Sequence, residues 1–414
     1  MSIATEISRL QSAKSDIKTA IEGKGVQVPS STKIDGYAAL VSQISQGTTE
    51  AEENDVNFYD YDGTRVASFT IAQAKALTQA EYNAILPPTH AGLTFQEWNW
   101  TLADIQSYNR RYIDIGANYV PTDGKTHIKV SVKAGETFAI AVRITTYQLT
   151  IEWGDGNEET ASGNVVKSHT YSAAGKYEIV IDNNIGSDNA VWNFGGDNSL
   201  TYTQRMIEEM WFDGKVELSG YALMYVCAKV CLPLSCLPSI AASTFYAASV
   251  PMVAVPRGSN GIYSSSIFGM FNGKICLPKT MPSTSISATF SGYTGTRLII
   301  PDQGSKDFNN AYMQQVTLME IFSIPSNFGI ATNGTLVFNY ASRLRCMDIV
   351  QGWTPNNSLT FSTSTLWSPE DMVDFFTKLG TTTQTITLTF GTNNLNKLTA
   401  DQKAIATNKG YTLA

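Results

Sequence analysis

The feature that most limits how this chain can fold is a repeated apolar tripeptide that ends in proline. It occurs as VCLP, VAVP, ICLP and LIIP, with a degenerate fifth copy, FSIP. The five prolines, which are 23, 22, 23 and 24 residues apart, are Pro233, Pro256, Pro278, Pro301 and Pro325. Twelve residues after the first four prolines stand Phe245, Phe268, Phe290 and Met313. Two features that keep the same register indicate a true repeat.

A period of about 20 to 29 residues with one short strand per unit is typical of a leucine-rich-repeat-like solenoid, in which each coil stacks on its neighbours. We predict such a solenoid over residues 186–355. The usual L-x-x-L-x-L pattern is poorly matched. The apolar strand, its proline and the trailing aromatic residue instead resemble the BspA-type repeats of bacterial surface proteins and phage tail proteins.

Charge is scarce in this repeat. Residues 218–301 contain no Asp or Glu, and the whole chain is 16% charged, against about 25% for an ordinary soluble domain. The basic residues keep the register of the repeat: Lys229, Lys274 and Arg297 precede their prolines by four residues, and Arg257 and Lys279 follow theirs directly. Stacked coils would align them in a basic stripe that binds an anionic surface polymer or glycan. A solvated rim that prevents edge aggregation is the alternative.

Apolar residues recur with heptad spacing near the N-terminus, in a seam interrupted once by Lys14. The seam residues are Ile3, Ile7, Leu10, Ile17 and Ile21. A helix this short with an apolar seam needs partner helices. We therefore predict that residues 1–46 are a helical oligomerisation or docking segment, with a second helix after VQVP. A helical hairpin that packs within the chain is the alternative.

An acidic linker, GTTEAEEN, leads into a small module predicted over residues 54–120. Its VNFYDYDGTRVASFT stretch predicts two strands around an Asp62-Gly63 turn, and a short helix is expected around Ile71 to Ala80. The DYDGT stretch also resembles the DxDGT motif of haloacid-dehalogenase-type phosphatases, whose first Asp is the nucleophile. That family continues with helices, whereas Arg65 and an alternating strand follow here, so we favour the hairpin.

Residues 127–181 alternate between apolar and polar side chains, which predicts a small β-sandwich over residues 125–185. The WGDG turn at Trp153–Gly156, with the later HTY and GKY motifs, resembles the PKD-type immunoglobulin-like domain. In that family these motifs are structural signatures of extracellular and virion spacer or binding modules. Asp155 and His169 suggest acid–base chemistry, but no nucleophile accompanies them, and we interpret them as parts of a structural turn.

A compact α/β module is predicted over residues 356–414 as the cap of the solenoid. Ser368 should cap a helix that has Pro369 at its first position and stops at Gly380. TITLTF is a predicted strand. Thr399 and Gln402 should form a capping box for a last helix that ends at Gly410.

No catalytic residue, cofactor or metal site is predicted. The five cysteines are an odd count, which disfavours a disulfide framework, and Cys227, Cys231 and Cys236 lack the tight spacing and the fourth ligand of a thiolate site. The net charge of −7 disfavours binding to nucleic acid. Prolines interrupt the uncharged stretch 230–256, so no membrane insertion is expected. Glu6 and Arg9 stand where a signal peptide would need an apolar core.

Three further stretches resemble modules of tail proteins from bacteriophages and prophages: the opening SRLQSAKSDIKTAIEGKGVQVP, the VNFYDYDGTRV to LTFQEWNWTLADI segment, and the closing LTFGTNNLNKLTADQKAIATNKGYTLA. With the PKD-like and BspA-like parts, the resemblance covers most of the chain. It implies a mainly β, multidomain, non-enzymatic virion protein of the baseplate, tail-fibre or receptor-binding type, assembled in the host cytoplasm.

The resemblance also implies partners. Other tail or baseplate proteins would hold the N-terminal segment, the chain would form a homotrimer, and its β domains would present themselves to a glycan or protein of the host surface. A prophage-encoded or bacterial surface adhesin without enzymatic activity is the alternative.

Overall fold

The chain forms two compact units, residues 1–54 and residues 55–414, and each is described by itself. The structure is a computed structural model that describes residues 55–182 and 341–414 throughout, and residues 6–37 and 190–338 in part. The boundary between the units falls at the end of the predicted acidic linker.

In the first unit, the described positions between Glu6 and Lys18 are helical. Three seam residues, Ile7, Leu10 and Ile17, are 51%, 50% and 42% exposed. Ile3 and Ile21 lie outside the described residues. The apolar seam therefore faces solvent at every position that the structure describes, although the Lys14 ammonium does lie 5.8 Å from the centre of the Tyr37 ring.

The second unit is mainly β and begins with residues 55–121, here named the aromatic segment. It contains a four-stranded sheet in the order β2-β1-β4-β3. The strands are β1 (Val56–Tyr59), β2 (Arg65–Phe69), β3 (Leu93–Trp98) and β4 (Ile113–Pro121), and the helices are α3 (Ile71–Ala76), α4 (Gln79–Asn83) and α5 (Leu102–Ser107). The predicted β1–β2 hairpin is confirmed. The single helix expected at 71–80 is wrong, because Thr78 starts a second helix with its own capping box.

The next strands form one hydrogen-bonded sheet in the order β11-β9-β6-β8-β5-β10-β12, with β7 paired to β6. Their bounds are β5 (Thr126–Val132), β6 (Thr137–Glu152), β7 (Glu158–Thr170), β8 (Gly175–Asp182), β9 (Ala190–Asn193), β10 (Ile207–Trp211), β11 (Val216–Leu218) and β12 (Lys229–Cys231), with a 3-10 turn η2 (Thr203–Met206) before β10. The period-two alternation predicted for 127–181 is confirmed in β5, whose inward residues are buried at every second position.

The WGDG turn joins β6 to β7 and is held by side chains that the sequence motif supplies. The Trp153 ring stacks on His169 with centroids 5.2 Å apart, and His169 Nε2 lies 2.7 Å from Asp155 Oδ2. The Tyr171 hydroxyl donates to the Trp153 carbonyl at 2.9 Å. Gly154 has φ +83°, and a Cβ there would lie 2.5 Å from the Glu178 carbonyl oxygen. These contacts are what a structural turn requires.

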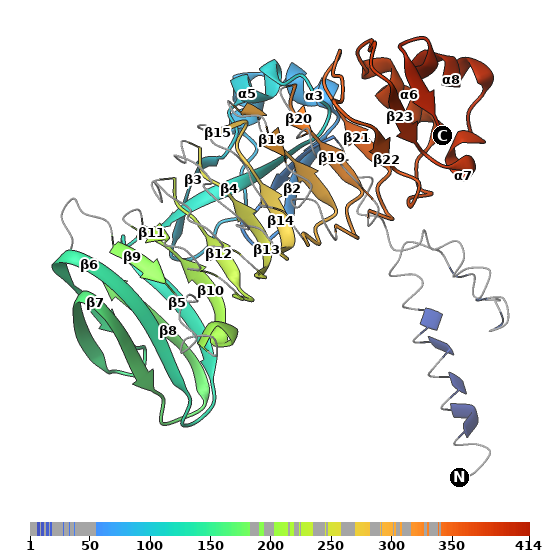
Figure 1. The fold of residues 1–414 in the computed structure, drawn as a ribbon. Coiled ribbons are helices and arrows are strands. Elements are labelled where there is room, and N and C mark those ends of the chain that lie inside the picture. Colours follow the sequence, from blue (N-terminus) through green and yellow to red (C-terminus); the bar gives the residue numbers. More distant parts are fainter. Residues whose placement is uncertain are drawn as a thin grey trace. The chain divides into compact units, whose positions relative to one another are not determined.

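From β10 onward, strands of the repeat pair in parallel with a partner 20 to 25 residues further along the chain (Figure 1). The paired residues are Glu209 with Lys229, Met252 with Lys274, Arg297 with Ile321, and Ile321 with Cys346. We name β10, β12, β13 (Ser249–Ala254), β14 (Asn272–Cys276), β16 (Arg297–Ile299), β19 (Ile321–Ser323) and β21 (Cys346–Asp348) the parallel strands. Two outer parallel pairs accompany them, β15 (Thr280–Met281) with β17 (Asp302–Gln303) and β18 (Asp307–Phe308) with β20 (Gly329–Ile330).

The C-terminal residues form a second small parallel sheet flanked by helices. Its strands are β22 (Leu359–Thr360), β23 (Ile386–Thr389) and β24 (Tyr411–Leu413), and its helices are α6 (Pro369–Lys378), α7 (Thr392–Leu395) and α8 (Ala400–Thr407). The caps predicted at Ser368 and Thr399 are confirmed. The last helix ends at Thr407 rather than at Gly410, because the chain turns there into the unpredicted strand β24.

Both faces of the parallel strands are buried. One face belongs to a core that continues from Ile128 to Tyr411. The other packs against the aromatic segment and contributes Cys231, Met252 and Cys276 to a second core. Burial on both faces is usual for parallel strands, and it explains why these cysteines act as small buried apolar side chains. The prediction of separate 54–120 and 186–355 modules did not include this shared core.

Candidate functional site

The aromatic segment donates a side-chain hydrogen bond to the carbonyl that precedes each of four repeat prolines. Because proline has no N–H, the strand ladder cannot continue through it, and the carbonyl group before it needs another donor. The donor–acceptor pairs are Asn118 to Leu232 (2.9 Å), Asn99 to Val255 (3.0 Å), Trp100 to Leu277 (2.7 Å) and Arg110 to Ile300 (2.6 Å). The segment is therefore in register with the repeat.

All five cations of the predicted basic stripe point toward this segment. Their partners are Asp62 for Lys229 (3.9 Å), Glu97 for Arg257, the Tyr59 ring for Lys274 (4.7 Å), the Ser107 hydroxyl for Lys279, and Asp114 for Arg297 (3.0 Å). The charges are thus engaged within the chain. Binding of an anionic polymer by the stripe stays a prediction.

Arg297 is not a surface cation, which corrects its place in the predicted stripe. Its side chain is 4% exposed and that of Asp114 is 6% exposed, and its Nε also donates to Asp114 Oδ2 at 3.0 Å. The Asn57 side-chain amide also donates to this carboxylate, at 3.3 Å. Sequence spacing could not show this, because the covering segment lies about 180 residues earlier in the chain.

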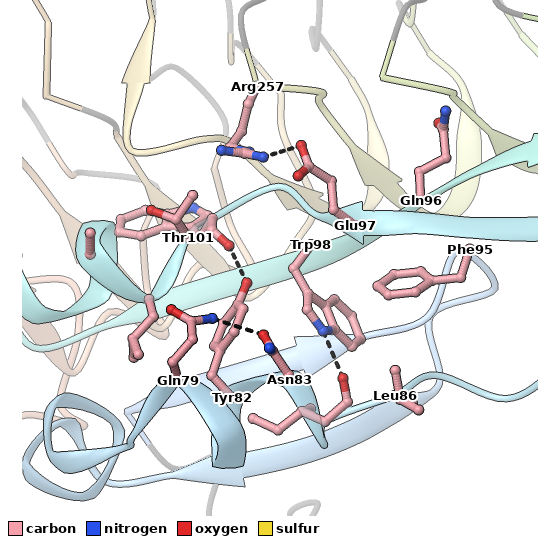
Figure 2. A pocket seen from close by; sticks show the side chains of 14 residues that line it. Gln79, Tyr82, Asn83, Leu86, Phe95, Gln96, Glu97, Trp98, Thr101 and Arg257 are labelled. Carbon is pink, nitrogen blue, oxygen red and sulfur yellow. Dashed lines mark hydrogen bonds and ion pairs between the residues drawn. The ribbon is translucent and has the colours of Figure 1, made fainter.

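A pocket of about 490 Å³ opens at the rim of the same interface (Figure 2). Figure 2 shows the rings of Tyr82, Trp98 and Phe95 across the pocket and the Glu97–Arg257 ion pair beside them. Gln79 and Asn83 line it from α4, and Leu86 lies at its mouth with 64% of its surface exposed. The pocket therefore combines apolar rings with amide and charged groups.

A β-bulge brings the two rings of β3 together. Phe95 pairs with Tyr119 and Glu97 with Asn118, so Gln96 is an extra residue in β3. In a regular strand, Phe95 and Trp98 would point to opposite faces. With the extra residue their centroids lie 5.3 Å apart. The extra residue is itself anchored, since the Gln96 side-chain oxygen accepts from the Leu234 N–H at 2.8 Å.

Two of the aromatic side chains that line the pocket are fixed by hydrogen bonds to main-chain carbonyls. The Trp98 indole N–H donates to the Ile85 carbonyl at 2.9 Å, and the Tyr82 hydroxyl donates to the Trp100 carbonyl. Burial raises the pKa of Tyr82 above its usual value, so this hydroxyl stays protonated and keeps donating. The hydrogen bond to Glu97, which is stronger than the opposing effect of burial, raises the pKa of Arg257.

A smaller hollow of about 310 Å³ adjoins the pocket and shares Thr101 and Arg257 with it. Asp104 and Lys279 also line this hollow. The Asp104 carboxylate accepts from both the Thr101 backbone N–H (2.9 Å) and the Thr101 hydroxyl (2.6 Å) as the cap of α5. Two of the five predicted cations, Arg257 and Lys279, therefore lie at a hollowed surface.

In the DYDGT turn, Asp60 and Tyr61 are buried and Thr64 is exposed. Asp60 is 1% exposed, and its carboxylate oxygens lie 2.6 Å from His90 Nε2 and 2.7 Å from the Tyr119 hydroxyl. Tyr61 donates to the Glu209 carboxylate. These contacts join the β1–β2 hairpin to β4 and β10.

The pocket residues other than Arg257 were not predicted from the sequence. The signal that could have identified them is LTFQEWNW, where Phe95 and Trp98 stand three residues apart, a spacing that would place them on opposite faces of a regular strand. In the described part of the chain, no cluster of three or more His, Cys, Asp and Glu side chains could hold a metal ion. Within the same residues, no helix is long and apolar enough to cross a membrane.

Comparison of the chain with protein-family models, curated proteins and solved structures finds no match.

Proposed function

We propose that this chain is a non-enzymatic component of a phage tail that attaches through its N-terminal helix and binds the host cell surface with its β unit. In this proposal each of the parallel strands belongs to one coil of a BspA-type, leucine-rich-repeat-like solenoid. The β5–β8 region is a PKD-like sandwich, and residues 356–414 cap the solenoid. The sequence motifs of three regions support the tail assignment, and the exposed seam at Ile7, Leu10 and Ile17 supports assembly into a trimer.

The observation that carries the binding function is the pocket at the rim of the aromatic segment. It has the size of a small-ligand site, and it combines apolar rings with a few polar groups. Its two nearby carboxylates are committed to other partners, Glu97 to Arg257 and Asp104 to the start of α5. Glycoside cleavage needs two carboxyl groups that protonate and attack, so this arrangement favours binding without cleavage.

Adsorption tests the function directly. The purified full chain should bind cells of the strain that the phage infects and should block phage adsorption, and antibodies against it should label the tail in electron micrographs. A chain that is found on the bacterial surface and is encoded away from tail genes would overturn the proposal in favour of the adhesin alternative.

The N-terminal seam is tested by charge. Leu10→Asp places a carboxylate in the exposed seam and should convert trimers to monomers in analytical ultracentrifugation. Gln11→Asp, on the same helix but outside the seam, is the matched control and should leave the trimer intact. A trimer that survives Leu10→Asp would contradict the role of the seam.

A further inference from the structure

We propose that the pocket between α4, β3 and Arg257 binds a neutral saccharide of the host surface. This inference rests on the proposed attachment function and specifies its ligand. Three properties of the described lining residues support it: their aromatic rings, their side-chain amides and the balance of positive and negative charge.

The rings suit the apolar face of a sugar. The C–H groups on one face of a pyranose pack against aromatic rings, whose faces carry partial negative charge. Tyr82 and Phe95 are partly exposed, whereas Trp98 is only 2% exposed and supports Phe95 from behind. Phe58 contacts both Tyr82 and Trp98 from the core, with centroid distances of 6.2 and 5.1 Å. The two accessible rings therefore rest on a rigid base.

The amides suit hydroxyl groups. Gln79 and Asn83 are exposed neighbours on one face of α4, and the Gln79 amide nitrogen donates to the Asn83 oxygen at 2.8 Å. That bond uses one donor hydrogen of Gln79 and one acceptor position of Asn83. The Asn83 NH₂ group and the Gln79 oxygen remain to donate to and accept from adjacent hydroxyls of a ligand. A planar donor beside a planar acceptor matches a vicinal diol.

The charges favour a neutral ligand. The described charged residues that line the two hollows are Glu97, Asp104, Arg257 and Lys279, two of each sign. Glu97 and Arg257 form an ion pair, so the main pocket presents no excess charge. A phosphate polymer would need unpaired cations there. The adjoining hollow at Thr101 offers space for a second sugar unit, which favours an oligosaccharide over a single sugar.

Pocket filling provides the test in the full chain. Ala103 is exposed and lines the pocket from α5, so Ala103→Trp should occupy it without touching the core. Ala72→Trp, at an exposed position of α3 outside the pocket, is the matched control. Binding is measured by titration calorimetry with neutral trisaccharides of glucose, galactose and N-acetylglucosamine, and with poly(glycerol phosphate) as the anionic probe. Circular dichroism checks that each variant is folded.

The expected result is binding to at least one neutral trisaccharide that weakens by about ten-fold or more in Ala103→Trp and is unchanged in Ala72→Trp. Sugar binding that survives Ala103→Trp would overturn the pocket assignment. Binding only to poly(glycerol phosphate) would overturn the ligand class. Cell adsorption without any saccharide binding would overturn this inference and leave the proposed function standing. Saccharide binding without adsorption would overturn the attachment function and leave only the ligand class of the pocket.

Discussion

Among the carboxylate–arginine pairs that join the aromatic segment to the repeat, two differ in their surroundings. Asp114 and Arg297 are 6% and 4% exposed, inside the interface, whereas Glu97 and Arg257 are 36% and 32% exposed, at its rim. Removing one partner of a buried pair leaves the other charge unpaired and poorly solvated, whereas at the rim water can solvate the charge that has lost its partner. The same residue types therefore hold the fold at one position and shape a pocket at the other.

The largest effect is expected when the interior pair is broken. Arg297→Met leaves the Asp114 carboxylate buried without its cation and should lower the free energy of unfolding by about 3–5 kcal/mol. Arg257→Met at the rim should lower it by about 1 kcal/mol or less. Urea denaturation of both variants measures the difference. Equal losses would contradict the distinction, and adding Asp114→Asn to Arg297→Met should recover part of the stability.

A second contrast concerns two asparagines. Asn99 is fully buried and donates to the carbonyls of Val255 and Cys276, at 3.0 and 2.7 Å. In Asn99→Ala the Cys276 carbonyl keeps the Val255 N–H as a donor, whereas the Val255 carbonyl loses the Asn99 amide, so the free energy of unfolding should fall by about 1–3 kcal/mol. Asn83→Ala, at the pocket rim, should leave the unfolding midpoint unchanged but weaken saccharide binding. A large loss of stability in Asn83→Ala would contradict this separation of roles.

A smaller loss of stability is expected where the main chain of β4 lies very close to β13. Gly116 lies on β4 where a Cβ would stand 2.5 Å from Ala254 Cβ, so Gly116→Ala should force the segment and the strands apart. Overpacking of this kind costs about 1–3 kcal/mol, measured as a lower melting temperature. The compensating pair Gly116→Ala with Ala254→Gly should restore most of the loss; no recovery would show that the strain lies elsewhere.

Acid should weaken one contact at the edge of the interface. Burial alone would raise the pKa of Glu209, but hydrogen bonds from Lys129 and Tyr61 outweigh it and hold this pKa below its usual value. The stabilisation is therefore present above the ordinary carboxyl pKa and is lost as pH falls through the lower folded value.

Thermal melts compare the wild type with Glu209→Gln and with a control, Glu208→Gln. Glu208 pairs with Lys176 at the surface. The loss of stability between about pH 5 and pH 3 should be smaller in Glu209→Gln than in the wild type, and unchanged in the control. Identical pH profiles for all three proteins would exclude a contribution from Glu209.

Local patterns predicted much of the secondary structure. The Asp62-Gly63 hairpin, the alternating β5 strand, the caps at Ser368 and Thr399, and a strand at each proline-ended tripeptide all follow from backbone preferences within a few residues. The repeat also predicted partners about one period apart, and the pairing of Met252 with Lys274 and of Arg297 with Ile321 agrees with that spacing.

The sequence by itself determined the strands, their spacing and the scarcity of charge among them. Only the tertiary structure decided what covers their second face, because the aromatic segment reaches it from about 110 to 190 residues away and through hydrogen bonds to main-chain carbonyls, which carry no sequence signature. The spacing aligned five cations, but tertiary packing decided that Arg297 is buried and that Arg257 lines a pocket. Burial, rather than charge or spacing, separates the two roles.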